Sequence, residues 1–239
     1  MARSTVREVK GPAQLPAERR RNSRGAARRE VIARAAIDLI TERGVAAVRV
    51  VDVCKAAGVP NSAFYWYFQD LDDLMAQSII DARRLIRRSA AAAIAGIDDP
   101  LMRIFVTTRE CVRLAISDDV LRVMTASDVE PTIGGHRGAE LRKSFEVFIH
   151  DAVVMLSEGQ VRGVVRDDKA AVHLAHCVRS VAHYNVTSYY RGLLHGDLDV
   201  LADTIASFAV RGVCADVADA HEVERLASVY HSTTQERAT

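Results

Sequence analysis

The chain has 239 residues, 49% of them hydrophobic and 26% charged, so it is long enough to bury a core and has the composition of a globular protein. No segment has the roughly 20 consecutive apolar residues that a membrane-spanning helix needs. The basic, polar N-terminus also lacks the apolar core of a signal peptide. The composition therefore predicts a cytoplasmic protein.

The net charge of +1 is unevenly distributed along the chain. Residues 1–29 carry nine cations against two anions, a net of +7, and the remaining 210 residues therefore sum to −6. A polar, arginine-rich opening in front of an acidic body predicts a disordered basic arm over residues 1–24 that contacts an anionic partner. A solvated tail without a partner is the alternative.

Apolar residues recur at helical spacing nearly everywhere, which predicts an all-α fold. Gly44 and Gly58 are typical helix ends, and Pro60 followed by Asn61 is typical of a helix start. The expected helices span about residues 25–43, 49–57, 61–68, 70–94, 100–116, 119–129, 138–160, 168–192 and 198–218. A frayed or partly helical tail follows over residues 221–239.

The four cysteines are too far apart to suggest a disulfide framework or a zinc knuckle. Cys54, Cys111, Cys177 and Cys214 are expected to be small core residues in a reducing compartment. Three histidines and a cysteine on one predicted helix share a face, but no acidic or further cysteine ligand accompanies them. We therefore predict no metal and no cofactor.

Five consecutive aromatic residues, 64–68, lie on the third predicted helix and include the only tryptophan of the chain. Successive side chains on a helix step about 100° around its axis, so these five cannot all face one core. Phe64 and Phe68 are four residues apart and are expected to face inward, which leaves Tyr65 and Trp66 outward. Two short helices with an outward-facing second helix are the pattern of a helix-turn-helix that binds DNA in the major groove.

The segments RREVIARAAIDLITERG and VVDVCKAAGVPNSAFYWYFQDLDDL resemble the N-terminal domain of TetR-family transcriptional regulators over about residues 26–75. The resemblance implies a helix-turn-helix DNA-binding domain over residues 25–70. It also implies a helical ligand-binding and dimerisation domain over residues 71–220, joined to the first by a long helix. The expected function is that of a regulator that binds a palindromic DNA operator as a homodimer, most simply a repressor, and not that of an enzyme.

Carried over to this sequence, the resemblance implies that residues on and beside the second and third helices contact DNA. Side chains at the start of the recognition helix are expected to read bases, while cations and the outward aromatic residues hold the backbone. The expected DNA-binding residues are Arg49, Lys55, Asn61, Ser62, Ala63, Tyr65 and Trp66.

The resemblance also implies a small-molecule effector pocket in the second domain and dimerisation through the last two long helices. An apolar pocket with few polar groups suits a lipophilic or acyl-type effector. The expected ligand-binding residues are Phe105, Arg109, Met124, Phe145, Phe148, Ile149, Val178, Arg179, His183, Tyr184, Asn185 and Tyr189. The expected dimer stripe consists of Leu198, Leu201, Ile205 and Phe208, with Ala202, Ala209 and Gly212 as small residues; packing within one chain is its alternative.

Two other classes of function stay open at this point. The chain could be a DNA-binding regulator or activator without a small-molecule effector. It could also be a helical ligand-binding protein or enzyme that does not bind DNA, although it has no nucleophile elbow, phosphate-binding loop or H-E-x-x-H motif.

Overall fold

The computed structural model describes residues 17–118 and 133–236, with the side chains of residues 25–118 and 133–226. Within these ranges the chain is all-α, as the sequence predicts, and its only β-structure there is an isolated bridge between Val165 and Cys214. The elements are α1 (Ala17–Arg43), a 3-10 turn η1 (Val45–Ala47), α2 (Val50–Ala56), α3 (Asn61–Tyr65), α4 (Leu71–Ala93), α5 (Pro100–Ser117), α7 (Gly135–Val161), α8 (Ala171–Tyr190), α9 (Leu198–Val213) and α10 (Val217–Glu236).

Two helices include residues that the sequence does not predict to be fully helical. Helix α1 begins at Ala17, so residues 17–24 of the expected disordered arm are helical. Their alanine, glutamate and arginines are good helix formers, but these residues carry no apolar periodicity that would mark the helix. Helix α10 occupies most of the expected tail, and buried Ala220 and Val223 anchor it to the body.

Helix α3 is shorter than expected, and one predicted helix cannot be compared. Helix α3 ends at Tyr65, because the amides of Tyr67 and Phe68 both bond to the carbonyl of Phe64 and close a turn there. The predicted helix over residues 119–129 lies outside the described residues.

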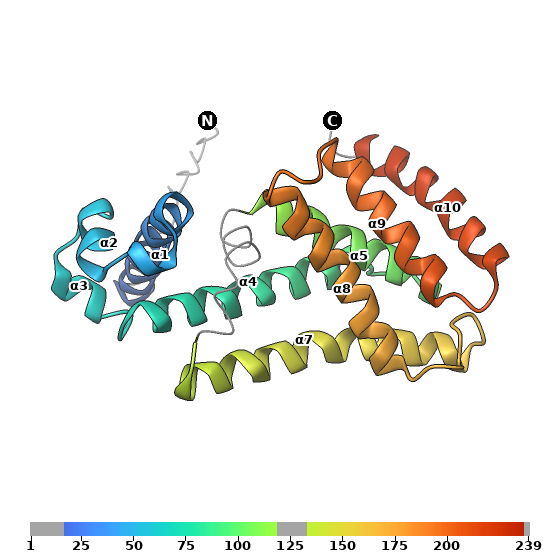
Figure 1. The fold of residues 1–239 in the computed structure, drawn as a ribbon, viewed down its shortest axis with the longest axis horizontal. Helices are drawn as coiled ribbons and strands as arrows, with labels where there is room; N and C mark the ends of the chain where they lie inside the picture. Colours follow the sequence, from blue (N-terminus) through green and yellow to red (C-terminus); the bar gives the residue numbers. More distant parts are fainter. Residues whose placement is uncertain (1–16, 119–132, 237–239) are drawn as a thin grey trace, which may run out of the picture.

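Helices α1, α2 and α3 form a small unit at one end of the molecule, coloured blue in Figure 1. Its core contains Ile37, Val53, Phe64 and Phe68, each at most 2% exposed, together with Leu74 from the start of α4. Helix α4 belongs to both halves of the molecule, because it begins in this core and runs on into the helical body (Figure 1).

Helix α5 lies at the centre of the body and packs against α4, α7, α8, α9 and α10. Its Leu101, Ile104 and Phe105 are nearly fully buried in the main core of the body. Helix α5 starts sharply, because the Asp99 side chain accepts a hydrogen bond from the amide of Met102 and proline occupies the first helical position. The body thus forms a second core, separate from that of the first unit.

Candidate DNA-binding surface and ligand cavity

The aromatic run at the end of α3 is divided between core and solvent in the way that its spacing predicts. Phe64 and Phe68 are 0% and 2% exposed, and their ring centroids lie 5.5 Å apart. Tyr65 and Trp66 are 61% and 85% exposed. Trp66 is therefore a large aromatic side chain held on the surface by two buried neighbours on the same segment.

The turn between α2 and α3 fixes the orientation of this surface. Gly58 has φ = 64°, a left-handed conformation that residues with a side chain rarely adopt. Pro60 follows with φ = −68° and immediately precedes the first residue of α3. The amide of Arg49 donates to the Asp52 carboxylate at 3.3 Å and stabilises the start of α2.

Most of the predicted DNA-binding residues lie on the exposed side of this unit. Asn61 and Ser62 at the start of α3 are exposed. So are two cations of α2, Arg49 immediately before its first residue and Lys55 in its last turn. Ala63 differs, because it is only 9% exposed and its methyl group is nearly covered by neighbouring atoms. Of the three residues of α3 that are predicted to read bases, the structure leaves Asn61 and Ser62 exposed.

A buried carboxylate links this unit to the body. Asp73, which is 2% exposed, accepts hydrogen bonds from the Gln69 amide and the Gln77 side chain, both at 2.7 Å. Its third partner is Arg137 on α7, with an Nη2 to Oδ1 distance of 2.7 Å. Arg137 also forms an ion pair with Glu140 one turn further along α7. One carboxylate therefore holds together the starts of α4 and α7.

The start of α7 also contributes apolar side chains to the core of the first unit. Ile133 and Leu141 are 4% and 1% exposed and belong to the same hydrophobic cluster as Phe64 and Phe68. Further along α4, the Arg83 guanidinium donates to the carbonyl of Leu141 at 3.0 Å. The first unit is therefore fixed by α7 as well as by α4.

The body contains a cavity of about 860 Å³ between α4, α5, α7 and α8. This volume lies within the range of about 300–1,000 Å³ that is typical of small-molecule sites. Much of the lining is buried and apolar, and it includes Ile79, Ile86, Ile104, Val112, Ile149, Met155, Leu156 and Val186. The cavity lies along α4 and α7, the two helices that continue to the first unit.

Five of the predicted ligand-binding residues line this cavity. They are Phe148, Ile149, Val178, Arg179 and His183. The guanidinium of Arg179 lies over the ring of Phe145, 4.5 Å from its centroid, and 5.9 Å from that of Phe148. The cation is thus part of an aromatic cluster at the cavity wall.

The other predicted ligand-binding residues are not among the residues that line it. Phe105 is buried in the main core, and Arg109 forms ion pairs with Asp199 and Asp203 on α9. Helical periodicity places these residues on an inward face, but it does not decide whether that face meets a cavity or a neighbouring helix. Phe145 packs beneath Arg179, Tyr184 is 71% exposed, Asn185 donates to the Val181 carbonyl, Tyr189 packs against Tyr190, and Met124 lies outside the described residues.

The cavity lining contains six arginines and only one carboxylate, that of Asp151. Sequence reasoning identified only Arg179 among the six and missed Arg83, Arg84, Arg87, Arg88 and Arg103. The run DARRLIRRSA in α4 is the signal that could have pointed to Arg83, Arg84, Arg87 and Arg88, because residues three and four apart share one side of a helix. Arg103 lies on α5, outside this run.

Cys111 is a further cavity residue that the sequence gives no reason to select. Burial in an apolar wall, with a smaller contribution from neighbouring Glu110, raises the pKa of its thiol to about 12. The thiol is therefore protonated and a weak nucleophile near neutral pH. Of the remaining cysteines, Cys54 and Cys214 are buried as expected, whereas Cys177 is exposed on α8.

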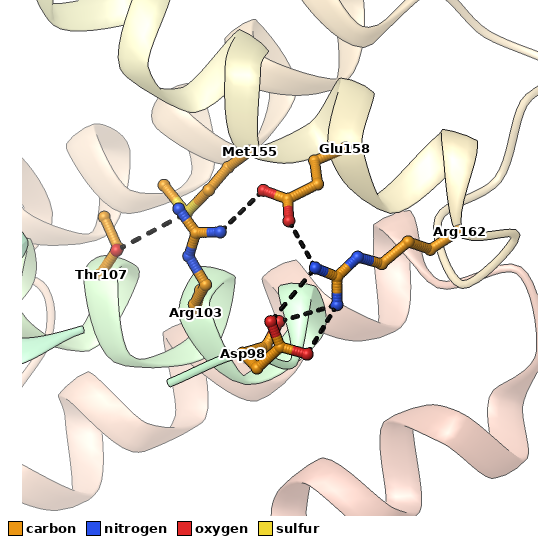
Figure 2. A network of polar contacts seen from close by, with 6 residues as sticks. All are labelled: Asp98, Arg103, Thr107, Met155, Glu158 and Arg162. Atoms are coloured by element: carbon orange, nitrogen blue, oxygen red, sulfur yellow. Dashed lines mark hydrogen bonds and ion pairs between the residues drawn. The ribbon is translucent and has the colours of Figure 1, made fainter. Parts of the chain in front are cut away.

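A chain of ion pairs begins at Arg103 of the cavity lining, and Figure 2 shows its members. Arg103 of α5 binds Glu158 of α7 at 2.7 Å, and Glu158 also binds Arg162 at 2.8 Å. Arg162 in turn forms an ion pair with Asp98 at 3.0 Å, and this contact lowers the pKa of the Asp98 carboxyl. These contacts hold the end of α7 against the start of α5.

The outer sides of α8 and α9 carry exposed apolar side chains. Tyr184 on α8 is 71% exposed, and Val200 and Phe208 on α9 are 64% and 61% exposed. Gly212 on α9 has open space where a side chain would be.

The stripe that the sequence predicts for a dimer is thus split between two sides of α9. Ala202, Ile205 and Ala209 are buried within the chain, where α9 packs on α5, and Leu198 and Leu201 are partly buried. Phe208 and Gly212 remain on the outside.

Metal-binding clusters and membrane-spanning helices are both absent from the described part of the chain. No group of three or more His, Cys, Asp or Glu residues that could hold a metal ion occurs among the described residues. Over the same residues, no helix has both the length and the apolar character needed to cross a membrane.

Residues 32–77 match the family model of bacterial regulatory proteins, tetR family, and so confirm the resemblance seen in the sequence. This match contains α2, α3 and the start of α4, together with the second part of α1 from Ile32 to Arg43. No curated protein matches the chain in sequence.

Solved structures of tetR-type regulators share the fold of the chain. The fatty acid degradation regulator FadR from Bacillus halodurans superposes with a TM-score of 0.68 at 17% identity over 77% of this chain and 95% of that one. FadR from Bacillus subtilis in complex with stearoyl-CoA gives 0.67 at 18% identity over 77% and 98%. AibR in complex with isovaleryl coenzyme A and operator DNA gives 0.64 at 14% identity over 76% and 97%. The matched family and these structures are transcription regulators and not enzymes.

Proposed function

We propose that this protein, whose N-terminal segment matches the tetR family of regulatory proteins, is a ligand-responsive repressor. It binds a palindromic operator as a homodimer, and a lipophilic or acyl-type small molecule releases it. The observation that carries the proposal is the exposed aromatic pair Tyr65 and Trp66 at the end of α3, held by buried Phe64 and Phe68. Because its partner is DNA, we place the protein in the cytoplasm.

In the proposed complex, α3 lies in the major groove. Asn61 and Ser62 reach base edges, where an asparagine side chain pairs well with adenine. The phenol of Tyr65 and the indole N–H of Trp66 donate to phosphate oxygens, and Arg49 and Lys55 add charge on either side of α2. The excess of cations over anions in residues 1–29 supports this contact with the anionic backbone.

One such unit reads only a few base pairs, so specific binding needs two units on two half-sites. Two identical subunits related by two-fold symmetry supply them. We propose that the subunits pair through the outer sides of α8 and α9. Exposed apolar residues support this choice, since Tyr184, Val200 and Phe208 are each more than 60% exposed. Gly212 allows a partner helix to approach closely.

The effector binds in the cavity between α4, α5, α7 and α8, and this is supported by its volume of about 860 Å³ and its apolar lining. Two of the similar structures are described as complexes with acyl coenzyme A thioesters, which favours an acyl-type ligand here. A ligand that shifts α4 or α7 changes the separation of the two α3 helices in the dimer. Such coupling is worth about 1–3 kcal/mol, or roughly 5- to 150-fold in operator affinity.

The test is selection of bound fragments from a genomic DNA pool, followed by fluorescence anisotropy on the selected duplex at two salt concentrations. We expect a palindromic sequence and an affinity that falls steeply with salt. Trp66→Ala should weaken binding by roughly 10- to 150-fold, which corresponds to the loss of one hydrogen bond to a charged group. It should leave stability within about 0.5 kcal/mol, because the side chain is on the surface.

The matched control is Val161→Ala, since Val161 is 88% exposed at the other end of the molecule. This variant should bind DNA like the original protein. If the selection enriches no sequence, or if Trp66→Ala unfolds the protein while the folded fraction keeps its affinity, the proposal is wrong.

A further inference from the structure

The lining of the ligand cavity contains more cationic than anionic side chains. Its lining includes six arginines and a single carboxylate, whereas most of its other lining residues are apolar. A neutral lipophilic ligand would need none of these cations. The number and position of the arginines therefore indicate which chemical groups the ligand has.

Three of the arginines lie together at the rim of the cavity. Arg84, Arg87 and Arg88 are three and four residues apart on α4, and therefore share one side of the helix. Arg84 and Arg88 are exposed, and Arg87 is partly exposed. Across from them on α7, the lining includes exposed His150 and the partly exposed Asp151. The charged rim thus lies between α4 and α7, and the buried apolar lining lies behind it.

The rim arginines have few anionic partners within the chain. Arg87 forms a two-point ion pair with Asp151, at 2.6 and 3.1 Å, which joins α4 to α7. Arg84 pairs at 3.1 Å with Asp81, which Arg29 of α1 also binds. Arg88 donates to the Arg84 carbonyl at 3.3 Å and forms no ion pair with a described residue. A guanidinium has five donor hydrogens, so this rim can donate several more hydrogen bonds.

We propose that the effector is an amphipathic anion. Its carboxylate or phosphate binds to Arg84, Arg87 and Arg88 at the rim, and its apolar part lies in the cavity behind them. Arginine forks bind both anions in a bidentate manner, which lysine does not do as well. The inference rests on the proposed function and adds to it the charge of the ligand and the residues that bind it.

The same geometry connects the anion to the DNA-binding unit. An anion at Arg87 competes with Asp151 for the same guanidinium, and so weakens a direct contact between α4 and α7. Arg29 is held by Asp81 of α4, and α1 belongs to the DNA-binding unit. A change at the rim therefore acts on a helix that carries this unit, through contacts that the structure already has.

Calorimetric titration of the full chain with four probes tests the inference. The probes are decanoate, decanol, decanoyl coenzyme A and coenzyme A alone. We expect decanoate or decanoyl coenzyme A to bind at least about tenfold more tightly than decanol, a difference of roughly 1.4 kcal/mol. Tighter binding of decanoate would identify a carboxylate as the ligand group, and tighter binding of the thioester would identify phosphate. Coenzyme A alone should bind weakly, because it lacks the apolar tail.

The double variant Arg84→Gln/Arg88→Gln removes two rim charges without removing the contact between Arg87 and Asp151. It should lose about tenfold in affinity for the anionic probes and keep its affinity for decanol. The matched control is Arg166→Gln, which removes one surface cation that pairs with Asp168 and does not line the cavity. It should leave all four affinities unchanged.

Three results would overturn the inference. They are equal affinities for decanol and the anionic probes, unchanged anion binding in the double variant, and the absence of binding by all four probes. Operator binding by the ligand-free protein is measured in parallel. If the ligand-free original protein does not bind the operator, the proposed function is contradicted instead. A failure of the proposed function can therefore be told apart from a failure of the inference about the ligand.

Discussion

The contact between Arg137 and Asp73 offers a direct test of how the DNA-binding unit is held on the body. The Asp73 carboxylate is 2% exposed and accepts three hydrogen bonds at 2.7 Å, from Gln69, Gln77 and Arg137. Only the one from Arg137 carries a full positive charge. Arg137→Met keeps much of the side-chain length but removes this charge, and so leaves a buried carboxylate without its cation.

We expect Arg137→Met to lower the free energy of unfolding by about 1.5–3 kcal/mol, the usual worth of a hydrogen bond to a charged group. The two remaining hydrogen bonds on Asp73 favour the lower part of that range. For a chain of this size, each kcal/mol lowers the melting temperature by about 2–4 °C, so a decrease of about 3–12 °C should be observed. Glu140, which pairs with the same arginine, loses that partner and keeps His136, whose Nε2 lies 3.3 Å from its carboxylate.

The assay is thermal unfolding at a fixed protein concentration, together with hydrogen exchange of the amides at the start of α7. Arg142→Met is the matched control, because Arg142 is exposed on the same helix and forms no ion pair with a described residue. The variant at position 137 should show faster exchange near Gly138 and Leu141, and the control should not. Equal melting temperatures for the two variants would refute the claim that the contact between Arg137 and Asp73 stabilises the packing of α7 on α4.

Two other predictions concern the outer surfaces of the body. Phe208→Glu places a charge on the exposed side of α9, where Phe208 is 61% exposed. This variant should sediment as a monomer instead of a dimer, with unchanged helix content. A stable dimer of the variant would contradict the proposed interface. The Asp98–Arg162 ion pair lowers the pKa of Asp98, so its contribution to stability is present above the usual aspartate pKa near 3.9 and is lost as the pH falls through the lower folded-state value. Asp98→Asn should therefore lower the free energy of unfolding at pH 6 but not at pH 2. High salt should reduce this loss of stability, because Asp98 is 91% exposed. A loss of stability that is the same at both pH values would count against this reasoning.

The amino-acid sequence by itself determined the all-α class and the helix-turn-helix unit that matches the tetR family model. Helical spacing within one segment decides which of its side chains share a face, and this is a local property of the chain. Phe64 and Phe68 could be assigned to the core and Tyr65 and Trp66 to the surface for that reason. The glycine and proline residues around α3 likewise act on the conformation of their own segment.

Only the tertiary structure decided what each inward face meets. Arg109 and Arg179 both lie on helices of the body, yet Arg109 meets two aspartates of α9 and Arg179 meets aromatic rings at the cavity. The pairs Arg87–Asp151 and Arg137–Asp73 each join residues 64 positions apart, and no local pattern specifies such a partner. The cavity and the docking of α7 on the DNA-binding unit result from the packing of whole helices, which depends on all the side chains between them.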